Sequence, residues 1–131
     1  MKLAILSANP SLYSTNRLKE AAEKRGHDVE VINHNHCYVA METDANSVYL
    51  GDHELEGFDA IIPRIGASVT FYGSSIIRQF EVKHVYTTLS SLALVRSRDK
   101  LRALQLIGNS GVEMPVTGYV HLSRDIESVL L

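Results

Sequence analysis

The order of the first apolar segments is what most restricts the fold of this chain. Lys2–Leu6 is a short apolar run with β character, residues 15–25 have one apolar face typical of a helix, and Val29–Ile32 is a second apolar run. Gly26 stands where a helix stop is expected. A strand, a helix and a strand in this order predict parallel strands joined by a right-handed crossover.

The same alternation continues toward residue 94. We expect a small hairpin made of Ser47–Leu50 and His53–Leu55, a third core strand at Asp59–Ile62, a helix at residues 74–84 and a short strand at Val85–Thr87. The expected fold is therefore an α/β domain with a parallel sheet, and its first domain covers residues 1–94.

Residues 95–131 are expected to begin a second domain. The spacing of the apolar residues in Leu101–Ile107 predicts a helix with an apolar stripe, Pro115 blocks its continuation, and Val116–Val120 has the character of a strand. Ser123 resembles an N-cap, and the chain stops within the helix that follows. We expect from this ending that the sequence is the front piece of a longer protein.

Charge and composition exclude several classes of function. The net charge of −2 argues against general binding of nucleic acid. No run approaches the roughly 20 apolar residues that a membrane span requires. The single cysteine, Cys37, excludes an internal disulfide and fits a reducing compartment. We therefore expect a cytoplasmic protein without membrane or direct nucleic-acid partners.

Ligands of an open parallel sheet bind beyond the carboxyl ends of its strands. The loops at that edge are Ser7–Ser14, Asn33–Tyr38, Pro63–Gly73 and Thr87–Ser91. The first of them contains no glycine, so the phosphate-binding fingerprint of dinucleotide enzymes is missing. The third core strand ends in Pro63-Arg64, where a phospho-receiver domain would carry an aspartate.

The loop that follows Pro63 offers the most chemistry. Arg64 supplies a fork of donors suited to a carboxylate or a phosphate. Gly66 and Gly73 would permit a close backbone approach, and we expect Gly73 to precede a helix whose N-terminus favours anions. The alternative is a structural loop, in which Arg64 pairs with a nearby acid and Tyr72 is a packing residue.

A histidine-rich segment raises the question of a metal site. His34 and His36 would point to the same side of an extended segment, with Cys37 and His53 as further candidate ligands. No fourth ligand has the spacing of a metal motif, so we expect no metal here. Cys37 is better interpreted as a small buried residue.

Four basic residues gather within a short segment, at Arg96, Arg98, Lys100 and Arg102. Such a cluster is either a solvated helix face or a surface that meets a phosphate at the start of a helix. Composition alone leaves both interpretations open.

Taken together, these motifs resemble the RimK family of ATP-grasp amino-acid ligases. The resembling segments are Met1–Ser7, Ser11–Ser14, Phe58–Gly66, Thr70–Gly73, Arg78–Glu81, Arg96–Leu104 and Pro115–Gly118. The resemblance implies a Rossmann-like pre-ATP-grasp domain, followed by the first helix and strand of an ATP-grasp domain.

The resemblance also implies a reaction. Such ligases use ATP and magnesium to convert a carboxylate into an acyl phosphate, which an amine then attacks. One branch adds glutamate to the C-terminus of a small-subunit ribosomal protein. The family pattern places Lys100 near the ATP phosphates, and it implies that Arg64, Gly66 and Tyr72 face the acceptor substrate.

The magnesium ligands and most of the ATP cleft lie beyond residue 131 in that family. We therefore expect no catalytic residue, no metal ligand and no bound cofactor in this chain, and no activity from it alone. The loop Ala8-Asn9-Pro10 departs from the charged, glycine-containing loop of the family. Two alternative functions remain, a ligase that acts on a carrier protein or a small peptide and a stand-alone receiver-like binding module. Among partners, we also consider a second copy of the protein in a homo-oligomer.

Overall fold

Parallel pairing joins four strands into the main sheet of the computed structural model, which describes residues 1–43 and 45–129. The strands are β1 (Lys2–Ser7), β2 (Asp28–Ile32), β6 (Ala60–Arg64) and β7 (Tyr86–Thr87), in the order β2-β1-β6-β7. All three pairings are parallel, as the strand–helix–strand pattern predicts. The carboxyl ends of these strands therefore lie at one edge of the sheet.

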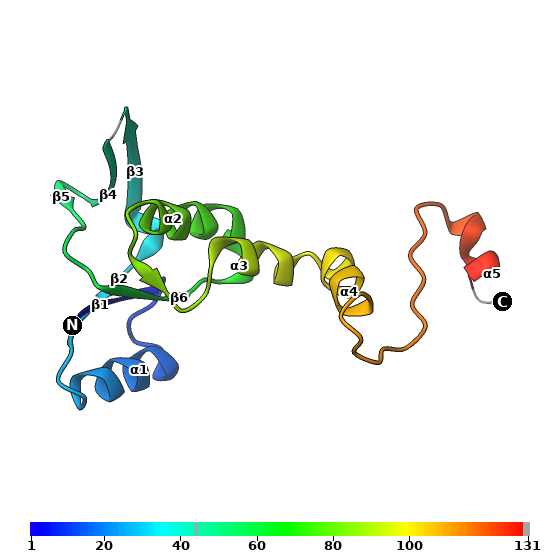
Figure 1. Ribbon diagram of the computed structural model, residues 1–131, viewed down its shortest axis with the longest axis horizontal. Helices are drawn as coiled ribbons and strands as arrows, with labels where there is room; N and C mark the ends of the chain where they lie inside the picture. Colours follow the sequence, from blue (N-terminus) through cyan, green and yellow to red (C-terminus); the bar gives the residue numbers. More distant parts are fainter. Residues whose placement is uncertain (44, 130–131) are drawn as a thin grey trace. The chain divides into compact units, whose positions relative to one another are not determined.

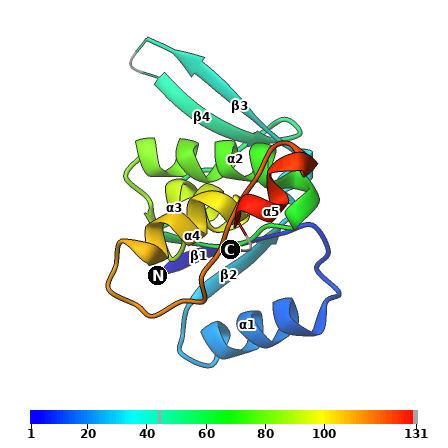
Figure 2. The same ribbon diagram turned by 90° about the vertical axis from the view of Figure 1, so that its right-hand side faces the viewer.

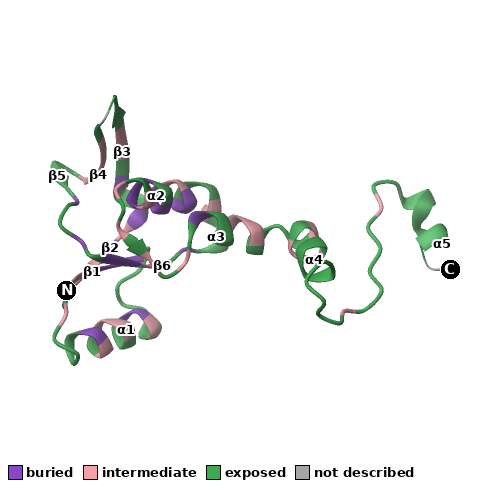
Figure 3. Ribbon diagram, viewed as in Figure 1, coloured by how far each residue is buried: buried purple, intermediate pink, exposed green. Residues whose placement is uncertain are grey.

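Two helices cover opposite faces of this sheet (Figures 1 and 2). They are α1 (Tyr13–Glu23) and α2 (Thr70–Val82), and each begins before its expected position. On one face, Leu3 and Ala60 pack with Ala22 of α1. On the other, Leu6 and neighbouring strand residues form a larger cluster with Phe80 and the isoleucines of α2. Figure 3 shows the buried residues gathered on the sheet and on the facing side of α2.

The segment after β2, which was expected to be a loop, has regular secondary structure. It forms a short 3-10 helix, η1 (His34–His36), and then a strand, β3 (Cys37–Glu42), that the sequence pattern did not predict. This strand pairs antiparallel with β4 (Ala45–Leu50), which pairs in turn with β5 (His53–Glu54). The predicted hairpin is therefore part of a separate three-stranded sheet.

Side chains of α2 hold this second sheet. Val48 of β4 is fully buried in the core that α2 shares. Gln79 Nε2 donates to Ala40 O at 3.4 Å and to Asn46 Oδ1 at 3.3 Å, so one side chain connects two strands. The end of α2 is linked in the same way to α3 (Ser91–Arg98), because Glu81 accepts hydrogen bonds from the backbone and the hydroxyl of Ser91.

The chain divides into two compact units, Met1–Val95 and Arg96–Leu131. The second unit contains α4 (Lys100–Gly108), a 3-10 turn, η3 (Ser123–Asp125), and the short helix α5 (Ile126–Val129). Asp99 Oδ1 accepts a hydrogen bond from Arg102 N at 3.0 Å and so caps α4. No helix in the described part of the chain is both long and apolar enough to cross a membrane.

The strand expected at Val116–Val120 is not formed. These residues have no regular secondary structure, and Val116 is completely exposed. The β-branched residues of the segment 116–120 favour a strand, but a strand forms only beside another strand to which it can hydrogen-bond. No strand of the second unit, within the residues that the structure describes, supplies one.

Candidate functional site

Arg64 is the last residue of β6 and stands at the carboxyl edge of the main sheet. Parallel register places it beside Ser7, the last residue of β1. Its guanidinium group reaches across to the start of α1, where Nη2 donates to Ser14 Oγ at 3.0 Å. Arg64 is exposed, and the salt bridges between described residues do not include it. If the loop were merely structural, Arg64 would form an ion pair with a nearby acid. No such ion pair of Arg64 occurs in the described part of the chain.

The loop between β1 and α1 is held by its own side chains. Ser7 is almost fully buried, and its Oγ lies 3.0 Å from Thr15 Oγ1 and donates to Asn9 O at 3.1 Å. Asn9 Oδ1 accepts a hydrogen bond from Ser11 N at 2.9 Å. These contacts assign a structural role to Ser7 and Asn9. They also fix the position at which α1, and with it Ser14, begins.

The N-terminus of α1 adds positive potential beside Arg64. Leu12 precedes the helix and provides no side-chain cap, and the first turn contains no acidic residue. The first N–H groups of a helix have no intrahelical acceptor, and they carry the positive end of the helix dipole. With the guanidinium of Arg64 and the hydroxyl of Ser14 alongside, this edge can bind a carboxylate or a phosphate. The sequence pattern identified Ser14 only as part of a motif. It could not predict the contact with Arg64, because the two residues lie 50 positions apart.

Gly66 and Gly73, the two glycines that follow β6, have different surroundings. Gly66 has an ordinary φ of −69°. A Cβ added there would meet only Val69 Cγ2, at 3.9 Å. Gly73 lies inside α2 and does not precede it. A Cβ at Gly73 would lie 2.3 Å from Ile65 Cγ2, so this glycine lets α2 pack closely on the loop.

Tyr72 lies on α2 and is linked to the second sheet. Its hydroxyl donates to Cys37 O at the start of β3, while 41% of the residue stays exposed. The hydrogen bonds of the described residues thus connect Arg64 to α1 and Tyr72 to the hairpin. They do not join these two predicted site residues to each other, and the substrate roles of Gly66 and Tyr72 remain predictions.

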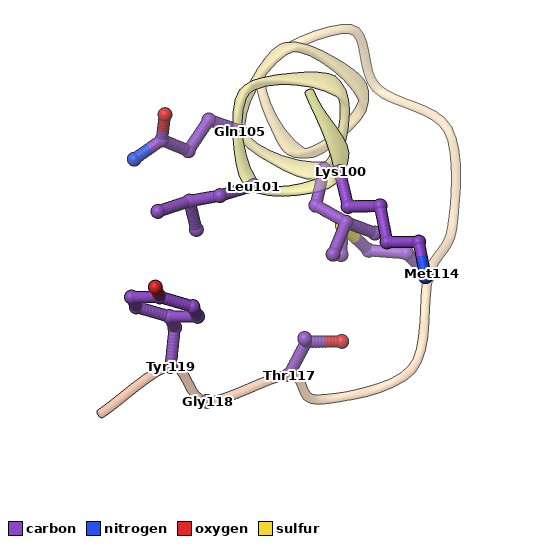
Figure 4. A pocket seen from close by; sticks show the side chains of 8 residues that line it. Lys100, Leu101, Gln105, Met114, Thr117, Gly118 and Tyr119 are labelled. Carbon is purple, nitrogen blue, oxygen red and sulfur yellow. The ribbon is translucent and has the colours of Figure 1, made fainter. Parts of the chain in front are cut away.

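Lys100 is the first residue of α4 and borders a hollow of about 390 Å³ within the second unit. Leu101 and Gln105 of α4 face Thr117, Gly118 and Tyr119 across this hollow (Figure 4). Its lining is mostly apolar apart from the ammonium, amide and hydroxyl groups. One exposed cation beside an apolar cavity is compatible with a phosphate contact, but it forms only part of such a site.

The histidine-rich segment does not form the extended arrangement considered for a metal. His34 is fully buried in η1, whereas His36 is exposed. Neither ring nitrogen of His34 has a hydrogen-bond partner in the described part of the chain, and burial lowers the pKa of this imidazole. Burial raises the pKa of the Cys37 thiol to about 11, as expected for an unreactive core cysteine. No group of three or more metal-ligating side chains occurs among the described residues.

Comparison with known proteins identifies the first unit. The family model described as RimK PreATP-grasp domain matches residues 1–94. A "Probable alpha-L-glutamate ligase 1" of Hahella chejuensis is 57% identical over 130 residues, which cover 99% of this chain and 43% of the relative. A "Probable alpha-L-glutamate ligase" of Trichodesmium erythraeum is 53% identical over 130 residues, covering 99% of this chain and 44% of the relative.

The chain thus spans less than half the length of these curated relatives. The matched segment includes the whole main sheet, both of its covering helices and the Arg64 loop. This chain belongs to the RimK family, through its pre-ATP-grasp domain.

Proposed function

We propose that this chain is the amino-terminal part of an ATP-dependent carboxylate–amine ligase that transfers glutamate, and that Arg64 binds the carboxylate of the acceptor. The names of the relatives support the ligase class. The observation that carries the assignment to Arg64 is its exposed guanidinium at the carboxyl edge of the sheet, 3.0 Å from Ser14 Oγ and next to the uncapped start of α1.

The geometry indicates how this edge would act. A guanidinium offers two parallel N–H donors to a carboxylate, which fixes both its position and its orientation. Ser14 holds the arginine from one side, so fewer side-chain rotamers have to be lost when the acceptor binds. The N–H groups of α1 would stabilise negative charge on the same side. Arg64 therefore positions the acceptor, and it takes no part in proton transfer.

Mg-ATP would supply the phosphoryl group that converts the acceptor carboxylate into a reactive acyl donor. Lys100 is the residue of this chain proposed to contact the ATP phosphates, because its charge is exposed at the start of α4 beside the hollow. We place the magnesium ligands and the catalytic residues in the part of the longer protein that this chain does not include. On that basis the chain alone is inactive.

The proposed acceptor is the C-terminus of a small-subunit ribosomal protein in the cytoplasm, with glutamate as the incoming amine. Support for this acceptor comes from the family resemblance. An amino-group carrier protein or a small peptide would present the same terminal carboxylate to Arg64, so acceptor identity has to be measured directly.

The test uses full-length ligase carrying Arg64→Lys or Arg64→Ala, with ATP and acceptor varied in turn. We expect the apparent KM for acceptor to rise at least tenfold in Arg64→Lys while the apparent KM for ATP stays within twofold. Arg17→Lys is the matched control, because Arg17 is an exposed arginine of α1 that pairs with Glu20. Wild-type acceptor kinetics in both Arg64 variants would remove this residue from the site.

A further inference from the structure

The ends of β1 and β6 are neighbours, and their last side chains point to the same face of the main sheet. Parallel register pairs Leu3 with Ala60 and Ser7 with Arg64. Leu3 and Ala60 pack with Ala22, which identifies the face that α1 covers. Side chains along a strand alternate between the two faces. Ser7 and Arg64 follow after an even number of residues and therefore point to the face of α1.

Two hydroxyl groups in the first turn of α1 meet these two strand ends. Thr15 Oγ1 lies 3.0 Å from Ser7 Oγ. Ser14 Oγ accepts a hydrogen bond from Arg64 Nη2 at 3.0 Å. Consecutive residues of one helix thus contact the ends of neighbouring strands. The positions of the two contacts are coupled, because a single peptide unit joins Ser14 to Thr15.

The two contacts differ in their exposure to water. Thr15 is completely buried and Ser7 is almost so, whereas Arg64 is exposed. A hydrogen bond between buried groups is strengthened by the low local dielectric, and water does not compete for it. The Ser7–Thr15 pair is therefore the fixed contact, and the guanidinium of Arg64 is the group that a ligand can reach.

The hydrogen bonds of Ser7 also have a direction. Its hydroxyl donates its single proton to Asn9 O at 3.1 Å. Thr15 Oγ1 is therefore the donor in the bond that it shares with Ser7 Oγ. A valine in place of Thr15 would have nearly the same shape but no proton to donate.

Thr15 holds the first half of α1 against the sheet. The helix has two buried residues, Thr15 and Ala22. They lie about 10 Å apart along the helix axis, at a rise of about 1.5 Å per residue. Leu12, which precedes the helix, provides no side-chain cap. The contact of Thr15 with Ser7 is thus the buried attachment that lies next to Ser14.

We propose that Thr15, together with Ser7, is a positioning residue of the acceptor site. It fixes the first turn of α1, so that Ser14 holds the guanidinium of Arg64 in the orientation that binds the acceptor carboxylate. Neither hydroxyl of the pair touches the acceptor, because both are buried. A bidentate guanidinium is sensitive to orientation, and small displacements of a binding group weaken its contact strongly. This inference rests on the proposed function of Arg64.

A positioning role and a purely structural role differ in their kinetic effects. If the pair only stabilised the fold, its loss would lower the fraction of folded enzyme and hence the rate per total protein. The KM of the enzyme that remains folded would not change. If the pair positions Arg64, its loss raises the KM for acceptor in the folded enzyme.

Steady-state kinetics of full-length ligase test this difference. We expect Thr15→Val to raise the apparent KM for acceptor about threefold to tenfold, the effect of one neutral hydrogen bond, while the KM for ATP stays within about twofold of wild type. Thr15→Ser keeps the hydroxyl and should restore the KM for acceptor. Ser7→Ala removes the other member of the pair and should reproduce the effect of Thr15→Val. It provides the measurement if the valine variant does not fold.

Gln79→Met is the matched control for a loss of stability. Gln79 is also buried, and its side chain also joins separate elements by hydrogen bonds. It lies in the second half of α2, whereas the first turn of this helix follows the Arg64 loop. We expect this variant to be less stable than wild type and to keep the wild-type KM for acceptor.

A double variant shows whether the effect of Thr15 passes through Arg64. In an Arg64→Ala background, Thr15→Val should raise the KM for acceptor no further. A wild-type KM for acceptor in both Thr15→Val and Ser7→Ala, or an equal rise with and without Arg64, would overturn the positioning role and leave the proposed function standing. Wild-type acceptor kinetics in Arg64→Ala would instead remove Arg64 from the site, and the positioning role with it.

Discussion

At the scale of single residues, His34 combines complete burial with two ring nitrogens that have no partner in the described part of the chain. A charged imidazole in this position would lose its hydration without gaining any compensating contact. Burial accordingly lowers the pKa of His34 below its ordinary value of 6.5. The neutral form is the one compatible with the fold.

We therefore expect acid to destabilise the chain through His34. The unfolded state takes up a proton near pH 6.5, whereas the folded state does so only at lower pH, so stability is highest above 6.5 and falls as the pH drops through the interval below it. Urea unfolding between pH 8 and pH 5.5 should show this slope in wild type and lose most of it in His34→Leu. The exposed His36→Gln variant is the control. An unchanged slope in His34→Leu would exclude this residue as the source.

A second prediction at the residue scale concerns Gly73. Because a Cβ there would lie 2.3 Å from Ile65 Cγ2, Gly73→Ala requires the loop or α2 to shift, although alanine favours helices. Overpacking of this kind costs about 1–3 kcal/mol of unfolding free energy. Gly66→Ala should change the unfolding free energy by less than about 0.5 kcal/mol, since the added methyl meets only Val69 at 3.9 Å. Equal unfolding free energies for the two variants would contradict the packing role of Gly73.

At the scale of elements, the sequence predicted those strands and helices whose formation depends on residues close together in the chain. The strand–helix–strand order at the start of the chain correctly predicted β1, α1 and β2. The third core strand was expected to end before Pro63, but β6 continues through Pro63 to Arg64 and pairs with β1 there. Strand β3 could not be predicted in this way. Its stability depends on Gln79 and Tyr72, which lie more than 30 residues away in sequence. The placement of Arg64 at a strand end was predictable, but its contact with Ser14 was not.

The link between α2 and α3 leads to a prediction at the element scale. Glu81 accepts a hydrogen bond from Ser91 N at 2.9 Å and another from Ser91 Oγ at 2.6 Å, and Ser91 is buried. Hydrogen bonds to a charged group contribute about 1.5–3 kcal/mol each, but Glu81 is partly exposed, so we expect a total loss near the lower figure for Glu81→Ala. Chemical denaturation measures it, with Glu20→Ala on the exposed side of α1 as control. A loss no larger than that of the control would show that this link is unimportant for stability.

At the scale of the whole molecule, the chain contains a pre-ATP-grasp domain and a smaller second unit, and it covers 43% of a relative named as a ligase. Under the proposed function, acceptor binding and phosphate binding are contributed by different parts of the chain. Arg64 lies in the first unit, and Lys100 lies in the second. The two contributions should therefore be separable in kinetics of the full-length protein.

The last prediction concerns Lys100 and is tested in the full-length ligase and in the 131-residue chain. In full-length ligase, Lys100→Ala should raise the apparent KM for ATP about tenfold to a hundredfold, because a charge-assisted contact contributes roughly 1.5–3 kcal/mol. The KM for acceptor should change little, which is the reverse of the Arg64→Lys result. Lys24→Ala is the control, because Lys24 is an exposed lysine at the end of α1 and lies outside this basic cluster. The 131-residue chain should bind Mg-ATP weakly and show no ligation, since one lysine cannot hold a triphosphate. Micromolar affinity of that chain in calorimetry, or wild-type ATP kinetics in Lys100→Ala, would show that the phosphate contact lies elsewhere.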